Sequence, residues 1–183
     1  MNRQSLVEHI PGLRRYARAL TGDRWAADDL VQDTLERACS KWRLWLAGTD
    51  LRAWLFTLMH NLFISQVRSR SRQAQEGLSV SVDEVAHTLQ APAAPLGSAI
   101  DLQRCLLRLP SDQRAVLLLV TLEDMSYAEV AKVVGVPLGT VMSRLSRARD
   151  RMRELMDEPP GADPRVKSEV GPVKVAPALR RLK

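Results

Sequence analysis

The stretch from Met125 to Arg149 constrains the fold more than any other part of the chain, because it predicts two helices around a tight turn. Ser126 and Glu129 have the three-residue spacing of a capping box, which predicts a helix that begins there. Gly135 is placed to end this helix, and Pro137 presets the backbone for the first turn of the next one. The chain must therefore contain a pair of short helices that pack on further helices.

The second helix of this pair has two different faces. Its apolar face is formed by residues at helical spacing, namely Val141, Leu145, Ala148, Met152 and Leu155. Residues 138–153 also contain five arginines and one aspartate, a net charge of +4. Gly139 and Thr140 are small enough to let a phosphate approach the free backbone N–H groups. This layout is typical of a helix-turn-helix that presents a recognition helix to DNA, although the charge alone also fits a solvated basic face.

The composition limits the classes of function. The chain has 183 residues, a net charge of +6 and an isoelectric point of about 9.9, which suits one or two small domains and a polyanionic partner. We expect a cytoplasmic protein without membrane insertion, because no long apolar run or signal core is present. Cys39 and Cys105 lie in helical patterns, so we expect two buried free thiols. No catalytic constellation or metal-ligand spacing stands out, so we expect no enzyme, no metal and no cofactor.

Helical periodicity dominates both ends of the chain and strand signals are nearly absent, which predicts an all-α protein of two small domains. We place the first domain at 6–75 and the second at 100–157. Between them, residues 76–99 gain Ser, Gln, Ala and Pro and are typical of a flexible linker. Residues 158–183 are basic and rich in proline, and we expect a disordered tail.

An acidic stripe stands out on the predicted helix around residues 28–38. Four side chains three to four residues apart share its outer face: Asp29, Gln32, Asp33 and Glu36. One interpretation is a solvated face. The other is a docking surface for a basic protein partner, and the residues alone leave both open.

A polar line runs along the predicted helix that follows residue 50. Its members become basic toward the C-terminus, and they are Thr57, Asn61, Ser65, Arg68 and Arg72. Such a line can follow a nucleic-acid backbone. All four tryptophans lie in the first 54 residues, and we expect core positions for them, although stacking surfaces for unpaired bases remain an alternative.

Taken in order, these stretches resemble a bacterial RNA polymerase sigma factor of the extracytoplasmic-function group. The resemblance rests on Asp28–Asp33, on Leu51–Leu55 followed by Asn61, on Leu109–Arg114 and on Val136–Leu145. Leu13–Leu20 and Phe56–Asn61 are also similar to the general-stress subgroup. The resemblance implies an all-α fold in which sigma region 2 and the helix-turn-helix of region 4 are joined by a flexible linker.

The resemblance also implies partners and site residues. Core RNA polymerase would contact Asp29, Gln32, Asp33 and Glu36. The −10 element of the promoter would be opened and contacted by Leu46, Gly48, Asp50, Arg52, Asn61, Ser65, Arg68 and Arg72. The −35 element would be contacted by Pro137, Gly139, Thr140, Ser143, Arg144 and Arg147. An anti-sigma factor is the implied inhibitor.

Two observations qualify this resemblance. Met142 departs from the family pattern, in which arginine is frequent, and Ser146 is small, so shape reading or a different −35 sequence is favoured.

A rival hypothesis is a helix-turn-helix repressor or activator that binds duplex DNA without polymerase. That rival explains residues 100–157 equally well, but it leaves the acidic stripe unexplained.

Overall fold

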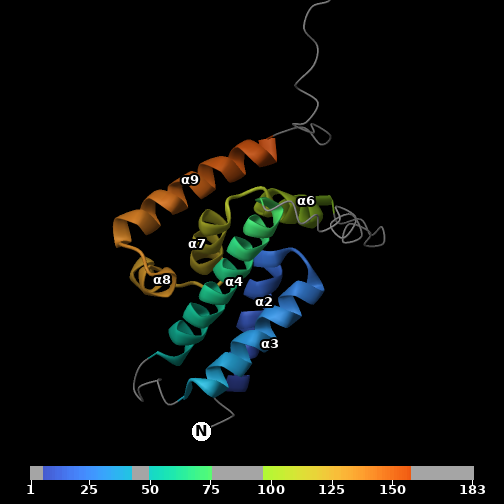
Figure 1. Cartoon of the computed structure of the whole chain (residues 1–183). Helices are drawn as coiled ribbons and strands as arrows, with labels where there is room; N and C mark the ends of the chain where they lie inside the picture. Colours follow the sequence, from blue (N-terminus) through green and yellow to red (C-terminus); the bar gives the residue numbers. More distant parts are fainter. Residues whose placement is uncertain (1–5, 43–49, 76–96, 158–183) are drawn as a thin grey trace, which may run out of the picture.

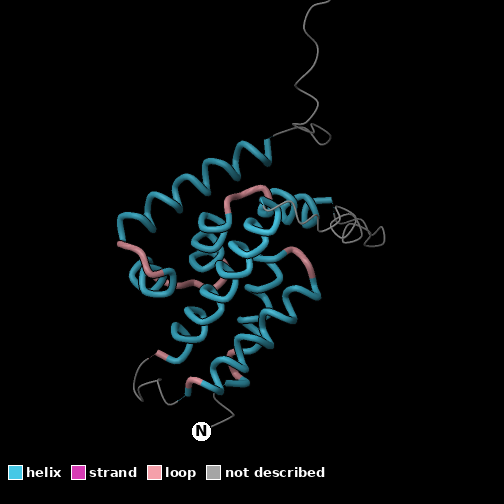
Figure 2. The backbone as a smooth tube through the Cα atoms, viewed as in Figure 1, coloured by secondary structure: helices cyan, strands magenta, loops and turns pink. Residues whose placement is uncertain are grey.

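The computed structural model describes residues 6–42, 50–75 and 97–157, and within these ranges the chain forms helices and loops but no strand (Figures 1 and 2). The first lobe contains α2 (Ile10–Thr21), α3 (Arg24–Ser40) and α4 (Leu51–Gln75). The second lobe contains α6 (Gly97–Leu107), α7 (Ser111–Thr121), α8 (Tyr127–Val134) and α9 (Leu138–Asp157). The predicted all-α class is confirmed. The predicted linker lies almost wholly, and the predicted tail entirely, outside the described residues.

Helix boundaries in the first lobe follow from local chemistry. The carboxylate of Asp23 accepts a hydrogen bond from the Ala26 N–H at 2.6 Å and so caps the start of α3. Gly22 ends α2 in a left-handed conformation, with φ of 76°. A Cβ on Gly22 would lie only 2.5 Å from Cδ1 of Leu107 on α6, so a larger residue would displace that side chain in addition to straining the left-handed backbone.

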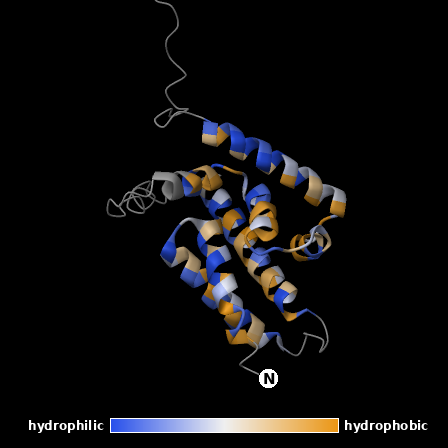
Figure 3. Cartoon of the chain, turned by 180° about the vertical axis from the view of Figure 1, so that it is seen from behind, coloured by the Kyte–Doolittle hydropathy of each residue, from blue (hydrophilic) through white to orange (hydrophobic). Residues whose placement is uncertain are grey.

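The helix-turn-helix forms as the sequence predicts. The Ser126 hydroxyl caps α8 and Glu129 completes the capping box, while Gly135 ends the helix at φ of 68°. The Ser126 hydroxyl and N–H both donate to Glu129, and these bonds hold the pKa of that carboxyl below its usual value. The five residues predicted for the apolar face of α9 are all buried. Figure 3 shows that the C-terminal part of this helix is largely hydrophilic outside.

The two lobes pack against each other. Helix α4 lies against α7 and α8, and α2 lies against α6 and α7 (Figure 1). On α4, the residues that face the second lobe include Phe63, whose ring carries the Arg114 guanidinium at 6.0 Å from the ring centre. Arg114 also donates to the Leu107 carbonyl at 3.1 Å and so helps to close the end of α6. This mutual placement of the lobes was not predicted from the sequence.

The two cysteines differ in environment. Cys105 is a buried free thiol, as predicted, and it lies 3.6 Å from the Leu155 carbonyl. Cys39 is exposed, so the prediction of burial is wrong there. The reason is register: the neighbouring Ala38 takes the inward position at this turn of α3. No helix in the described ranges has the length and apolarity that a membrane span requires.

Candidate protein and nucleic-acid interfaces

The outer face of α3 presents the acidic stripe to solvent. All four predicted residues, Asp29, Gln32, Asp33 and Glu36, are exposed. The Gln32 amide donates to a Glu36 carboxylate oxygen at 3.0 Å. Among the described residues no cation pairs with Asp29, Asp33 or Glu36. The stripe is therefore an uncompensated anionic surface, and a basic partner would complement it.

Trp25 extends this surface at the start of α3. Its side chain is 77% exposed, which is unusual for so large an apolar group. At about 100° per residue, Trp25 points to the same side of the helix as Asp29, Gln32 and Glu36. The expectation of a core position is wrong for Trp25, and the 25/29/32/36 spacing was the signal that would have corrected it. Trp42 and Trp54 are partly buried and pack edge to face at 6.4 Å.

The outer face of α4 carries the basic line. Asn61, Ser65, Arg68 and Arg72 are all exposed, and they extend over about 16 Å at 1.5 Å per residue. Thr57, at the head of the line, is partly buried, and its hydroxyl donates to the Ala53 carbonyl at 2.8 Å. Asp50 accepts from the Ala53 N–H at 3.2 Å and so caps the helix. Leu46 and Gly48 lie outside the described residues.

Arg52 does not join this line. Nine residues separate it from Asn61, which places the two on opposite sides of α4. Arg52 lies on the side that faces the second lobe, where its Nη2 is 3.1 Å from a Glu123 carboxylate oxygen. Its guanidinium also lies over the Phe56 ring, 5.6 Å from the centre. The residues predicted to contact the −10 element therefore divide into two separate places.

The N-terminal half of α9 forms the face predicted for duplex DNA. Pro137, Gly139, Ser143 and Arg147 are exposed and Thr140 is partly exposed. A Cβ on Gly139 would meet no atom within 4 Å, so the helix start is open to an approaching backbone. Arg144 differs, because its Nε lies 3.1 Å from a carboxylate oxygen of Asp112 and its side chain is only 25% exposed. This contact ties α9 to α7 and indicates a structural role for Arg144.

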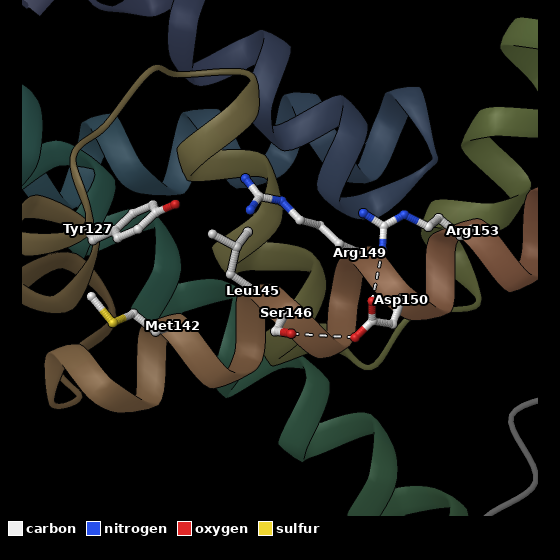
Figure 4. A pocket seen from close by; sticks show the side chains of 7 residues that line it. All are labelled: Tyr127, Met142, Leu145, Ser146, Arg149, Asp150 and Arg153. Carbon is white, nitrogen blue, oxygen red and sulfur yellow. Dashed lines mark hydrogen bonds and ion pairs between the residues drawn. The ribbon is translucent and has the colours of Figure 1, made fainter.

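A shallow concavity of about 250 Å³ lies beside this face (Figure 4). Tyr127 and Met142 form one end, and Arg149 and Arg153 border the other. The Asp150 carboxylate is engaged by Ser146 at 3.4 Å and by Arg153 at 3.0 Å. The only acidic group among the lining residues is thus partly neutralised, and the surface stays suited to an anion.

His60 is a buried titratable group on α4. Burial lowers its pKa to about 4, with a further lowering from the nearby Arg144 charge. Its Nδ1 has no hydrogen-bond partner. The described residues contain no cluster of three or more potential metal ligands.

Comparison with known proteins agrees with this architecture. Residues 6–60 match the family model "Sigma2 domain of PhyR", and residues 99–152 match "Sigma-70, region 4". The ECF RNA polymerase sigma factor EcfG of Rhodopseudomonas palustris (strain TIE-1) is 34% identical over 177 residues, covering 92% of this chain and 94% of that protein.

Solved structures give the same result. The sigma factor RpoE of Bartonella quintana, in complex with the anti-sigma factor NepR, matches with a TM-score of 0.72 and 36% identity over 84% of this chain and 95% of that one. CnrH, in complex with the cytosolic domain of CnrY, matches with a TM-score of 0.59 and 27% identity over 84% and 86%.

An all-helical protein of two lobes, one of which carries a region 4 helix-turn-helix, belongs to the DNA-binding factors of transcription. More narrowly, the chain belongs to the ECF RNA polymerase sigma factors, which direct RNA polymerase to particular promoters. The rival of a repressor that works without polymerase is not favoured.

Proposed function

We propose that three separate surfaces of this sigma factor carry its work, one for polymerase and two for promoter DNA. The observation that supports this most directly is their separation on the helices. The acidic face lies on α3, the basic line on the outer side of α4, and the recognition face on α9. The protein acts by binding rather than by catalysis, and it works in the cytoplasm with polymerase.

The polymerase surface consists of Asp29, Gln32, Asp33 and Glu36, and we add Trp25 to it. The carboxylates select a basic partner surface and orient the encounter. An exposed tryptophan at the head of the stripe supplies the apolar anchor that such interfaces require. A rim of charge around one aromatic side chain fits a protein interface better than a merely solvated face.

The −10 surface consists of the line from Asn61 to Arg72, together with the segment 46–50 that precedes α4. Arg68 and Arg72 bind phosphates, and Asn61 and Ser65 offer hydrogen bonds to an unpaired base or sugar. Extruding a base from the duplex costs a few kcal/mol, which contacts with the bound protein must offset. Arg52 lies on the other side of α4 and is paired with Glu123 while the lobes are packed, so it joins the −10 surface only when that pair opens.

The −35 surface is the start of α9. Pro137 and Gly139 keep the approach free of bulky side chains, Thr140 and Ser143 offer short polar contacts, and Arg147 reaches a base or phosphate. Arg144 supports this face by holding α9 on α7. Met142, which is 48% exposed, provides an apolar contact of the kind that thymine methyl groups accept.

Inhibition by an anti-sigma factor is part of the proposal. This chain is similar to RpoE, which was solved in complex with the anti-sigma factor NepR. It is also similar to CnrH, which was solved in complex with the cytosolic domain of CnrY. The similarity of the chain to the solved PhyR stress response regulator supports a role in stress response.

Two binding measurements test this function. The purified chain is expected to bind core RNA polymerase, and a promoter fragment is expected to shift strongly only when polymerase is present. Strong, specific binding of the duplex by the chain alone, with no binding to polymerase, would instead support the repressor hypothesis.

A further inference from the structure

A buried carboxylate joins the two lobes. Glu123 lies in the loop between α7 and α8, and its side chain is only 1% exposed. One of its carboxylate oxygens lies 2.9 Å from Nη2 of Arg15 on α2, and the other lies 3.1 Å from Nη2 of Arg52 on α4. Each arginine also donates to a carbonyl of the same loop, Arg15 to Leu122 at 3.2 Å and Arg52 to Glu123 itself. One loop of the second lobe is therefore held by two helices of the first.

Both sides of this contact are shaped for it. Asp124 adopts φ of 50°, a conformation that aspartate tolerates better than most residues, and this turn lets Glu123 and Met125 both point inward. In the first lobe, a Cβ on Gly12 would lie 3.1 Å from Oε2 of Glu123, so a bare glycine makes room for the carboxylate. The Phe56 ring supports the Arg52 guanidinium from below.

The distance between the two promoter elements is larger than the width of the packed lobes. Elements named for positions −35 and −10 are about 25 base pairs apart, or about 85 Å along the duplex at 3.4 Å per step. A compact body of about 150 residues has a radius of gyration of about 15 Å, so it is about 40 Å across. Bending so short a duplex around such a body costs up to about 10 kcal/mol. The packed lobes therefore cannot reach both elements at once.

From these observations we infer that Glu123, Arg15 and Arg52 form an intramolecular clasp that restrains the sigma factor in a closed state, and that this clasp must release before both promoter elements are bound. This inference rests on the proposed function only in its second half. The acidic face on α3 makes no contact with the second lobe that would hide it, so polymerase can dock before the clasp releases.

Water satisfies all three charged groups once the lobes part, whereas neutralising one partner in the closed state leaves the other two poorly matched. Arg15 and Arg52 are partly exposed, at 54% and 36% of their side chains, so solvent moderates the effect. We expect Glu123→Gln and Arg15→Glu each to raise the ratio of open to closed molecules by about tenfold.

The first measurement is independent of sigma activity. Dyes on the exposed Cys39 of α3 and on Glu154→Cys of α9, in a full-length chain with Cys105→Ser, report the separation of the lobes by energy transfer. Glu123→Gln and Arg15→Glu should lower the transfer, with helicity by circular dichroism unchanged. The matched controls Asp124→Asn and Arg14→Glu make the same charge changes at exposed neighbours and should leave it unaltered. Equal transfer in wild type and both clasp variants would overturn the clasp.

The second measurement tests what the clasp restrains. With core polymerase in excess and the factor limiting, Glu123→Gln should raise promoter-directed transcription severalfold over wild type and over Asp124→Asn. Parted lobes with unchanged or lower transcription would overturn the restraining role. Failure of the wild type to support transcription at all, with the energy-transfer result as expected, would instead contradict the proposed function and leave the clasp standing.

Discussion

The outer face of α3 and the side of α4 that faces the second lobe belong to the same lobe, but their charged side chains differ. Within the described ranges, those on this face of α3 are exposed and form no ion pair, whereas those on this side of α4 are buried or paired. On α3, Asp29, Asp33 and Glu36 remain in water without a cation among the described residues. On the inner side of α4, Arg52 meets a buried carboxylate and His60 is buried beside a second ion pair. Unpaired charges on the surface are available to a partner, whereas buried ion pairs hold the helices of this molecule together.

The largest effect is expected when the unpaired charges on α3 are reversed. Asp33→Lys with Glu36→Lys should weaken binding to core RNA polymerase about a hundredfold, because two repulsive contacts replace two attractive ones. Titration of labelled protein with core polymerase measures this. Glu8→Lys with Asp157→Lys makes the same change in net charge at exposed residues outside the acidic stripe and should bind as wild type does. Equal affinity of the two double variants would contradict the docking role of α3.

The burial of His60 on α4 predicts that the stability of the protein depends on pH. The pKa of His60 is about 4 in the folded protein and about 6.5 when unfolded, so the unfolded chain binds the proton first as pH falls. Between pH 6.5 and 4 this should cost about 2–3 kcal/mol of stability, and above pH 6.5 nothing. Urea unfolding of wild type and His60→Gln at several pH values measures it. A stability difference between the two proteins that stays constant from pH 7 to pH 4 would show that His60 is not shielded.

Trp25 is the apolar residue of the surface that we propose for polymerase on α3. Trp25→Ala should weaken polymerase binding by about 2 kcal/mol, as expected of an aromatic hot spot, with no loss of thermal stability because the side chain is mostly in water. Val7→Ala, at another exposed apolar residue of the same lobe, is the control. If the two variants bind polymerase equally, Trp25 is not an anchor.

Helix α9 carries an exposed arginine, Arg147, and an arginine that is paired with Asp112, Arg144. Arg147→Ala should reduce transcription from a promoter with an intact −35 element, without changing stability. The reduction should correspond to a loss of about 1–3 kcal/mol in promoter-binding free energy, the range of a single base contact. Arg144→Ala should instead lower the melting temperature, because it removes the contact with Asp112. Run-off transcription and thermal unfolding separate the two effects, and a reversed pattern would exchange the two roles.

Local structure in this molecule was largely predictable from the sequence. The capping box at Ser126, the left-handed Gly135 and the apolar face of α9 depend on residues close together in the chain, so their spacing predicted them. The exposure of the acidic stripe followed from helical register in the same way.

Contacts between the lobes were not predictable in this way. Glu123 meets Arg15 across 108 residues and Arg52 across 71, and no periodic pattern encodes such a contact. Arg52 and Asn61 are a different case, because they share one motif but their nine-residue spacing places them on opposite sides of a helix. Trp25 is a case of the same kind: its residue type favours burial, whereas its spacing from Asp29, Gln32 and Glu36 places it on the exposed face.

Promoter-directed initiation by this chain is tested by run-off transcription with core RNA polymerase, on DNA from upstream of the gene for this protein. We expect a specific transcript that requires the purified chain and is lost when either the −35 or the −10 sequence is scrambled. The transcript should also be lost with Asp33→Lys and Glu36→Lys together. Transcription that is the same with and without the chain, under conditions where the chain is folded and free of inhibitors, would show that the chain is not the initiation factor for this promoter.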